Sequence, residues 1–202
     1  MNSTVFSRRG FLATACSFAA LAALPSRVLA LTEAGARQLV DRVVADINRV
    51  IAGGGSDASK IREFEKIFST YADTAIMARY ALGADARSAS AGQMRAFTDA
   101  FEVYIANKYG RRFREFVGGT VTVKSTRAIK AGYEVRAQAD LQGQAPFDVT
   151  FLVSDKSGRD KFFNMFIEGV NLLLTERTEI GAMLDRRGGN IDQLIADLKA
   201  MG

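Results

Sequence analysis

The chain changes its hydrophobic period twice, and this change constrains the fold more than any other feature of the sequence. Up to Gly119 the apolar residues recur at helical spacing, over 120–167 they largely alternate with polar residues, and after Gly169 the helical spacing returns. A period of 3.6 residues buries one stripe of a helix, whereas a period of 2 buries one face of a strand. The order helices, strands, helices is typical of an α+β domain.

Four helices are expected before the strands. The first covers 32–52 and ends at the glycine run 53–55, since glycine disfavours a continued helix. Ser56 or Asp57 is a typical cap for the second. The third covers 76–82, and the fourth runs from about 90 toward 116.

Four strands follow, over 120–125, 133–141, 147–154 and 161–167. Their short connections predict an antiparallel meander. Two more helices are expected, one over 172–184 capped by Asn171 and one that begins with Asn190 and Gln193 as a capping box. We therefore expect one domain, 31–202, in which helices cover one face of a curved four-stranded sheet. Its appearance should be NTF2-like or cystatin-like, with an enclosed apolar pocket.

Residues 1–30 have the pattern of an export signal. The segment Ser7-Arg8-Arg9-Gly10-Phe11-Leu12 is a twin-arginine signature. It is followed by an apolar stretch and by small residues at the expected cleavage site after Ala30. The moderately apolar stretch Phe11–Leu24 rises only about 21 Å as a helix, which is short for a bilayer core of about 30 Å. Cleavage and a periplasmic location are expected, and a retained membrane anchor is the alternative.

Charge and missing residue types exclude several functions. Of the 27 Lys and Arg residues, Arg8, Arg9 and Arg27 precede the cut, and none of the 22 Asp and Glu residues does, so the net charge of the remaining chain is +2. Nucleic acid is therefore not an expected partner. The sequence contains no His, and its one Cys lies before the cut. A Ser-His-Asp triad, a His-ligated metal and thiol chemistry are thus excluded from the mature chain.

Polar clusters give no decisive signal for catalysis. Glu176 and Glu179 are spaced as on the solvated face of a helix, and the basic residues Lys108, Arg111 and Arg112 fit either a solvated face or contact with an anionic headgroup or partner. An Asp or Tyr in an α+β pocket can transfer protons, so an isomerase-like or hydratase-like enzyme remains open.

The sheet offers an apolar surface that suits a ligand. Phe147, Val149, Phe151 and Val153 share one face, and the neighbouring strand places the small Ala137 and Ala139 on it. Aromatic side chains beside alanines on a curved sheet leave a cavity, unless a helix fills it.

Several short sequence motifs resemble those of the MlaC family, also called the toluene-tolerance auxiliary family, of periplasmic phospholipid-transport proteins. They occur in the expected order from about Phe64 to Gly202: Ile76–Gly83, Gln93–Phe97, Phe101–Tyr109, Ile167–Leu173 and Gly188–Ile195. The family usually has a Trp after the first of these motifs, and this chain has no Trp. The family usually has an Asp where this chain has Asn164.

The resemblance implies a soluble, monomeric carrier without catalytic residues, metal or cofactor, whose cargo is a glycerophospholipid. Its partners would be an outer-membrane lipoprotein complex and an inner-membrane ABC transporter with a lipid-binding ring, and its role would be to maintain outer-membrane lipid asymmetry. The expected lipid-pocket residues come from the long helix, the inward strand face and the segment after Gly169: Phe101, Ile105, Phe147, Val149, Phe151, Val153, Val170, Leu172 and Leu173. Ordinary core packing is the alternative for each. Lys108, Arg111 and Arg112 are the expected headgroup or partner contacts. A small-molecule enzyme and a ligand-free adaptor remain the competing functions.

Overall fold

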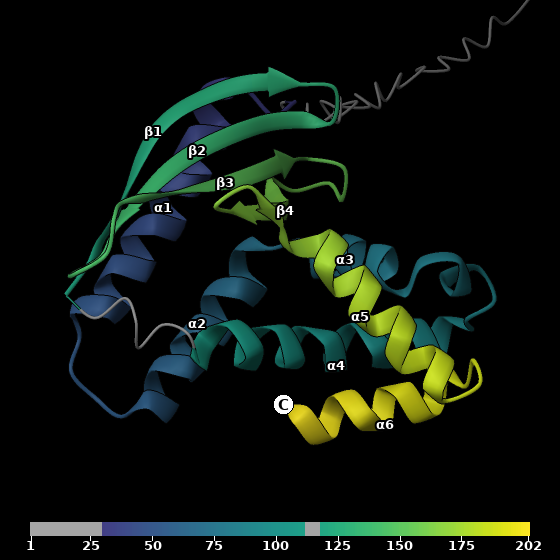
Figure 1. Ribbon diagram of the computed structural model, residues 1–202. Helices are drawn as coiled ribbons and strands as arrows, with labels where there is room; N and C mark the ends of the chain where they lie inside the picture. Colours follow the sequence, from purple (N-terminus) through teal and green to yellow (C-terminus); the bar gives the residue numbers. More distant parts are fainter. Residues whose placement is uncertain (1–29, 112–117) are drawn as a thin grey trace, which may run out of the picture.

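A computed structural model describes residues 30–111 and 118–202, and it has the expected α+β class (Figure 1). The predicted export signal, apart from Ala30, lies outside the described residues. So do Arg112 and the predicted end of the long helix near Phe116. None of the helices within 30–111 and 118–202 combines the length and the apolar character needed to cross a bilayer.

The predicted helices are all present, and a polar side chain caps each one. Their bounds are α1 (Glu33–Ala52), α2 (Asp57–Tyr71), α3 (Thr74–Leu82), α4 (Ala91–Gly110), α5 (Leu172–Arg186) and α6 (Ile191–Met201), with a 3₁₀ helix η1 (Gly83–Arg87) after α3. The predicted caps Ser56, Asn171 and Asn190 each accept a backbone N–H of the first turn, which offsets an otherwise unpaired donor. A capping box also forms at Ser90 and Gln93, where none was predicted.

The sheet is an antiparallel meander, as predicted, but it has five strands instead of four. In spatial order they are β1 (Thr120–Ile129), β2 (Gly132–Asp140), β3 (Phe147–Ser154), β4 (Lys161–Ile167) and β5 (Val170–Asn171). The two-residue β5 is too short to give an alternating pattern. It pairs with β4 across the turn Glu168-Gly169, where both residues have positive φ, 51° and 78°. Positive φ at both central residues is typical of a type I′ hairpin turn.

β1 is longer than predicted because it contains a bulge. The register with β2 shifts between Val123 and Ser125, so the inward alternation that begins at Val121 is interrupted there. The strand then continues to Ile129. A bulge places two residues opposite one and thereby hides the period of 2 from a sequence pattern.

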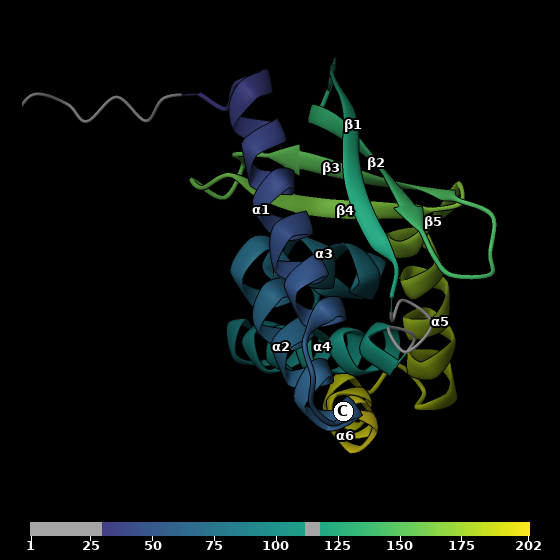
Figure 2. The ribbon, with the colours of Figure 1, turned by 90° about the vertical axis from the view of Figure 1, so that its left-hand side faces the viewer.

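The elements form an upper and a lower body with the core between them. The sheet arches over the helices, and α1 packs against β1 and β2 (Figures 1 and 2). Asn48 of α1 bonds to both backbone groups of Val121 in β1, each at 2.9 Å. The lower body contains α2 to α6, in which α4 packs against both α2 and α6 and α3 against α5. Because α1 is bonded to β1, we group it with the sheet; it also packs against α2, where the Tyr71 hydroxyl donates to Asp46 at 2.7 Å.

Candidate functional site

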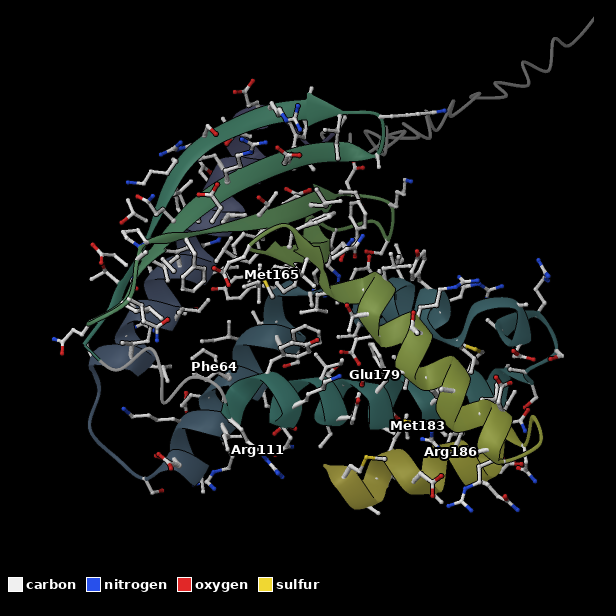
Figure 3. The ribbon with its side chains drawn as sticks, viewed as in Figure 1. Phe64, Arg111, Met165, Glu179, Met183 and Arg186 are labelled. Atoms are coloured by element: carbon white, nitrogen blue, oxygen red, sulfur yellow. The ribbon has the colours of Figure 1, made fainter. Side chains whose placement is uncertain are left out.

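An apolar cavity of about 150 Å³ lies between the two bodies. Its upper wall comes from β3 and β4, its sides from α1 and α2, and its floor from the C-terminal end of α4. Phe64 of α2 and Met165 of β4 border it from below and above (Figure 3). The lining residues are Val43, Ile47, Phe64, Ile67, Phe68, Ile105, Ala106, Tyr109, Gly110, Leu141, Gln144, Phe147, Phe151, Phe162, Met165, Ile167, Glu168 and Leu172.

Two small residues of α4 border this cavity. Ala106 and Gly110 are four positions apart, so both lie on the same face of the helix. The short side chain of Ala106 keeps the floor low beneath Phe151, which packs edge to face on Phe162 at 5.6 Å between ring centroids. A Cβ at Gly110 would be 3.5 Å from Ile61, so the glycine allows α2 to pack closely on α4. The cavity is therefore a property of both layers and not of the sheet alone.

Polar groups gather at one end of the cavity. Among the lining residues only Gln144, Glu168 and the Tyr109 hydroxyl bring polar side-chain atoms, and Glu168 is exposed. Two other hollows, one between α1 and α2 and one beside α3, are more open and are lined by charged side chains such as Arg49, Glu63 and Arg95. The apolar cavity is the one that suits a hydrocarbon ligand.

Four of the predicted pocket residues line the cavity: Ile105, Phe147, Phe151 and Leu172. Phe101, Val149, Val153 and Leu173 are buried in the surrounding core without being part of the lining. Val170, which was expected to close the opening, is 61% exposed on the outside of the hairpin turn.

Sequence reasoning missed the contribution of α1, α2 and β4 to the cavity. Phe64 and Phe68 recur at helical spacing, which predicts that this face of the helix is buried. The spacing does not indicate that the face borders the cavity. Phe162 and Met165 lie in a strand that looked apolar on both faces. A bulge opposite Leu152 and Val153 puts both of them on the inner face, which the sequence did not show.

The predicted basic contacts lie apart. The Lys108 ammonium group is 2.8 Å from Glu176 Oε1 and also pairs with Glu179, so it holds α4 to α5. Arg111 is exposed at the C-terminal end of α4 (Figure 3). Arg112 lies outside the described residues.

Glu176 is fully buried, so the predicted solvated position was wrong for this residue. Its Oε1 accepts from Lys108 and, at 2.6 Å, from the Tyr109 hydroxyl, whereas Oε2 has no partner within the described ranges. Glu179 is 46% exposed at its side chain, and Tyr104 donates to it at 3.1 Å. The correction has a physical reason: a helix face becomes a buried one when a neighbouring helix supplies the counter-charge.

The ionisation of this cluster follows from its burial and hydrogen bonds. Burial raises the pKa of Tyr104 to about 12. Burial and then the hydrogen bond to Glu176 raise the pKa of Tyr109 further. Burial opposes the charged form of Lys108, but its hydrogen bonds to Glu176 and Glu179 outweigh burial and raise its pKa. The hydrogen bond from Lys108 lowers the pKa of Glu179.

Carboxylates are scarce around the cavity in the described ranges. The only lining carboxylate is the exposed Glu168, and no cluster of three or more His, Cys, Asp or Glu side chains could hold a metal ion there.

Comparison with known proteins identifies the family. The family described as "MlaC protein" matches residues 37–200. The chain belongs to the MlaC family. The fold is also that of a phospholipid-binding protein from Ralstonia solanacearum, solved in complex with a phospholipid. That structure is 20% identical in sequence, with a TM-score of 0.70 over 82% of this chain and 96% of that chain. At this identity the likeness shows that the two chains share a fold.

Proposed function

We propose that this chain is a periplasmic phospholipid carrier, exported with its first 30 residues as a cleaved signal. The observation that carries the proposal is the apolar cavity with its polar groups at one end, because this arrangement matches a ligand with hydrocarbon tails and a polar head. Membership of the MlaC family and the phospholipid bound to the related Ralstonia structure support the same ligand.

The energetics of the cargo explain why such a carrier needs no catalytic residue. Two acyl chains contain about thirty methylenes, each worth about 0.8 kcal/mol when it leaves water. Ordering and imperfect packing offset part of this gain, but escape of the lipid into water stays slow. Unloading therefore requires an acceptor that shields the tails from water.

The acceptors in this proposal stand at the two membranes. They are an outer-membrane lipoprotein complex and an inner-membrane ABC transporter with a lipid-binding ring, between which the monomeric carrier moves lipid and maintains outer-membrane asymmetry. MlaC membership supports these partners. Phe147, Phe151, Ile105 and Leu172 are the predicted tail contacts that border the cavity, and Arg111 is a predicted headgroup or partner contact with an exposed side chain.

The described cavity must widen to hold this cargo. Cavities of about 150 Å³ bind a single benzene molecule, and this cavity has about that volume. A pair of acyl chains is several times larger. The described conformation is thus the closed state in this proposal, and loading moves the upper and lower bodies apart.

Filling the cavity tests the proposal directly. In Ala106→Phe a ring occupies the space above α4, so we expect co-purified phospholipid to fall at least about tenfold while the protein remains folded. Phe151→Asp should have the same effect, because a carboxylate in the tail site is costly to desolvate. Native mass spectrometry and organic extraction of periplasmic protein measure the lipid.

The matched control is Ala200→Phe, which adds the same ring to an exposed position of α6. It should carry as much lipid as the wild type. Wild-type protein without lipid, or with a small polar metabolite, contradicts the proposed function. Unchanged lipid in folded Ala106→Phe contradicts this location of the tails.

A further inference from the structure

Exposed apolar side chains gather at one corner of the molecule, beside the polar end of the cavity. In the described part of the chain the large exposed apolar residues are Tyr80 (41%), Val170 (61%), Leu174 (52%) and Met201 (44%). The first three lie at the β5–α5 junction and on the neighbouring helix α3, which packs against α5. Single exposed apolar residues need no explanation, but three on adjoining elements form a patch.

Arg177 completes this patch and is held in a fixed position. Its guanidinium stacks on the Tyr80 ring at 5.1 Å and donates to the Tyr80 carbonyl oxygen at 3.3 Å. It also lies against Gly83, where an added Cβ would be 3.3 Å from one of its nitrogens. Leu174 is three positions before Arg177 on the same helix face. We call Tyr80, Val170, Leu174 and Arg177 the α5 patch.

The α5 patch begins where the cavity ends. Glu168 and Leu172 line the cavity, and Val170 stands between them in sequence on the outer side of the hairpin turn. A lipid tail that leaves the cavity at this end would pass beside the patch. A contact that excludes water over the patch would therefore also cover the exit.

The charges on either side of the patch are ordered. Glu168 and Asp148 lie together at the cavity end, since the Glu168 N–H donates to the Asp148 carbonyl at 2.9 Å. Arg177 lies at the other end. None of these three side chains forms an ion pair within the described ranges. Across the surface, acidic side chains are thus followed by apolar ones and then by a basic one. A partner with basic, apolar and acidic groups in the matching order can bind in only one orientation.

We infer that the α5 patch is the docking surface for the protein that exchanges lipid with this carrier. Its partner would present an apolar surface with basic residues opposite Asp148 and Glu168 and a carboxylate opposite Arg177. The immobilised Tyr80–Arg177 pair has the composition and rigidity of a protein–protein hot spot. This rigid pair favours a protein over a membrane surface. The inference rests on the proposed function.

The test uses the lipid-loaded full-length mature protein and, as the probe, the purified lipid-binding ring domain of the ABC transporter proposed above. Tyr80→Ala, Leu174→Asp and Arg177→Glu should each weaken the Kd by about tenfold or more. Met201→Asp is the matched control, because Met201 is similarly exposed but lies on α6, and it should bind as the wild type does.

Several outcomes would overturn the inference. One is wild-type affinity in all three patch variants, and another is a wild type that does not bind the probe. A third is that these variants lose binding to phosphatidylethanolamine–phosphatidylglycerol vesicles but keep binding to the ring domain. Loss of a self-associated dimer in sedimentation experiments would assign the patch to a second copy. The lipid content of each variant separates this test from the test of the proposed function. Patch variants that carry as much lipid as the wild type and bind the ring domain equally well would refute the docking surface but not the carrier function.

Discussion

Glu176 owes its position to two residues of α4. The carboxylate is fully buried, and Lys108 and Tyr109 donate to the same oxygen. Removing one partner of a buried ion pair leaves a charge without compensation and costs about 3–5 kcal/mol, although the intact pair adds little stability over an apolar packing. The cluster therefore determines how α4 and α5 meet more than it stabilises the fold. Tyr109, which also lines the cavity, is held by it.

Alkaline pH should reveal this cluster. The pKa values of Tyr104, Tyr109 and Lys108 are all raised in the folded chain, that of Tyr104 to about 12. The unfolded values are about 10 for Tyr and 10.4 for Lys. The stabilisation is then fully present below about pH 10 and is lost as the pH rises through the folded values. Urea unfolding at increasing pH should show the free energy of unfolding falling over this range.

Tyr109→Phe should lower stability at neutral pH by about 1–3 kcal/mol, because a hydrogen bond to a charged group is lost. Its further loss above pH 10 should be smaller than in the wild type. Tyr80→Phe, at an exposed ring, serves as the comparison and should follow the wild-type profile. Parallel profiles of Tyr109→Phe and wild type would show that the Tyr109 hydroxyl does not carry the alkaline transition.

Single residues show where sequence reasoning reached its limit. The apolar positions Phe147 and Phe151 could be assigned to the inner face, because alternation within one strand determines it. Glu176 could not be recognised as buried, because its partners Lys108 and Tyr109 are about 67 positions away. Nothing in the local pattern indicates which helix will supply a counter-charge. Partners between elements are a property of the packing.

At the level of elements, two asparagines join the sheet to α5. Asn171 caps α5 by accepting from the Leu174 N–H at 3.0 Å, and it also accepts from the Asn164 side chain at 3.0 Å. The Asn164 oxygen in turn accepts from the backbone of Met165 and Leu173. An ionised Asp at position 164 could accept both backbone bonds but could not donate to Asn171. This chain thus uses an amide pair at the junction.

Asn171→Ala should destabilise the protein by about 1–3 kcal/mol, because it removes a helix cap and leaves the amide of the buried Asn164 without its partner. Asn190→Ala is the matched change at the cap of α6. It should cost only about 1 kcal/mol, since Asn190 is exposed and bonds only to its own helix turn. Urea unfolding of the two variants makes the comparison. Equal losses would mean that the Asn164–Asn171 bond contributes nothing beyond the cap.

The elements were predictable to the extent that local chemistry sets them. Glycines and capping residues defined the helices, and strict alternation defined β2 and β3. The bulges in β1 and β4 and the two-residue β5 interrupt or shorten that alternation, so the sequence pattern does not predict them. The β4 bulge helps to place Phe162 and Met165 in the cavity. For this reason only the β3 part of the cavity's upper wall could be predicted from the sequence.

At the scale of the whole molecule, the cavity lies between two bodies that are joined at several points. α1 is bonded to β1 through Asn48 and Val121 and also packs against α2, where the Tyr71 hydroxyl donates to Asp46 at 2.7 Å. Further links are the pairing of Ala72 and Asp73 with Phe162 of β4 and the junction of β4 with α5. A separation that keeps these links is a rotation about them, as in the hinge motions of many ligand-binding proteins.

Distance measurements between spin labels can detect this separation. The sequence has one Cys, at position 16 in the predicted signal, so a mature chain accepts two engineered cysteines without background labelling. Labels at the exposed Lys124 of β1 and Lys199 of α6 report on the two bodies. The distance should be longer by several ångströms in lipid-loaded than in delipidated protein, because tails larger than the closed cavity must push the sheet and α1 upward. Labels at Arg42 of α1 and Lys124, both in the upper body, should keep one distance in both states. Loaded protein with an unchanged Lys124–Lys199 distance would show that the tails enter through side-chain rearrangement alone, and the two-body account of loading would then be wrong.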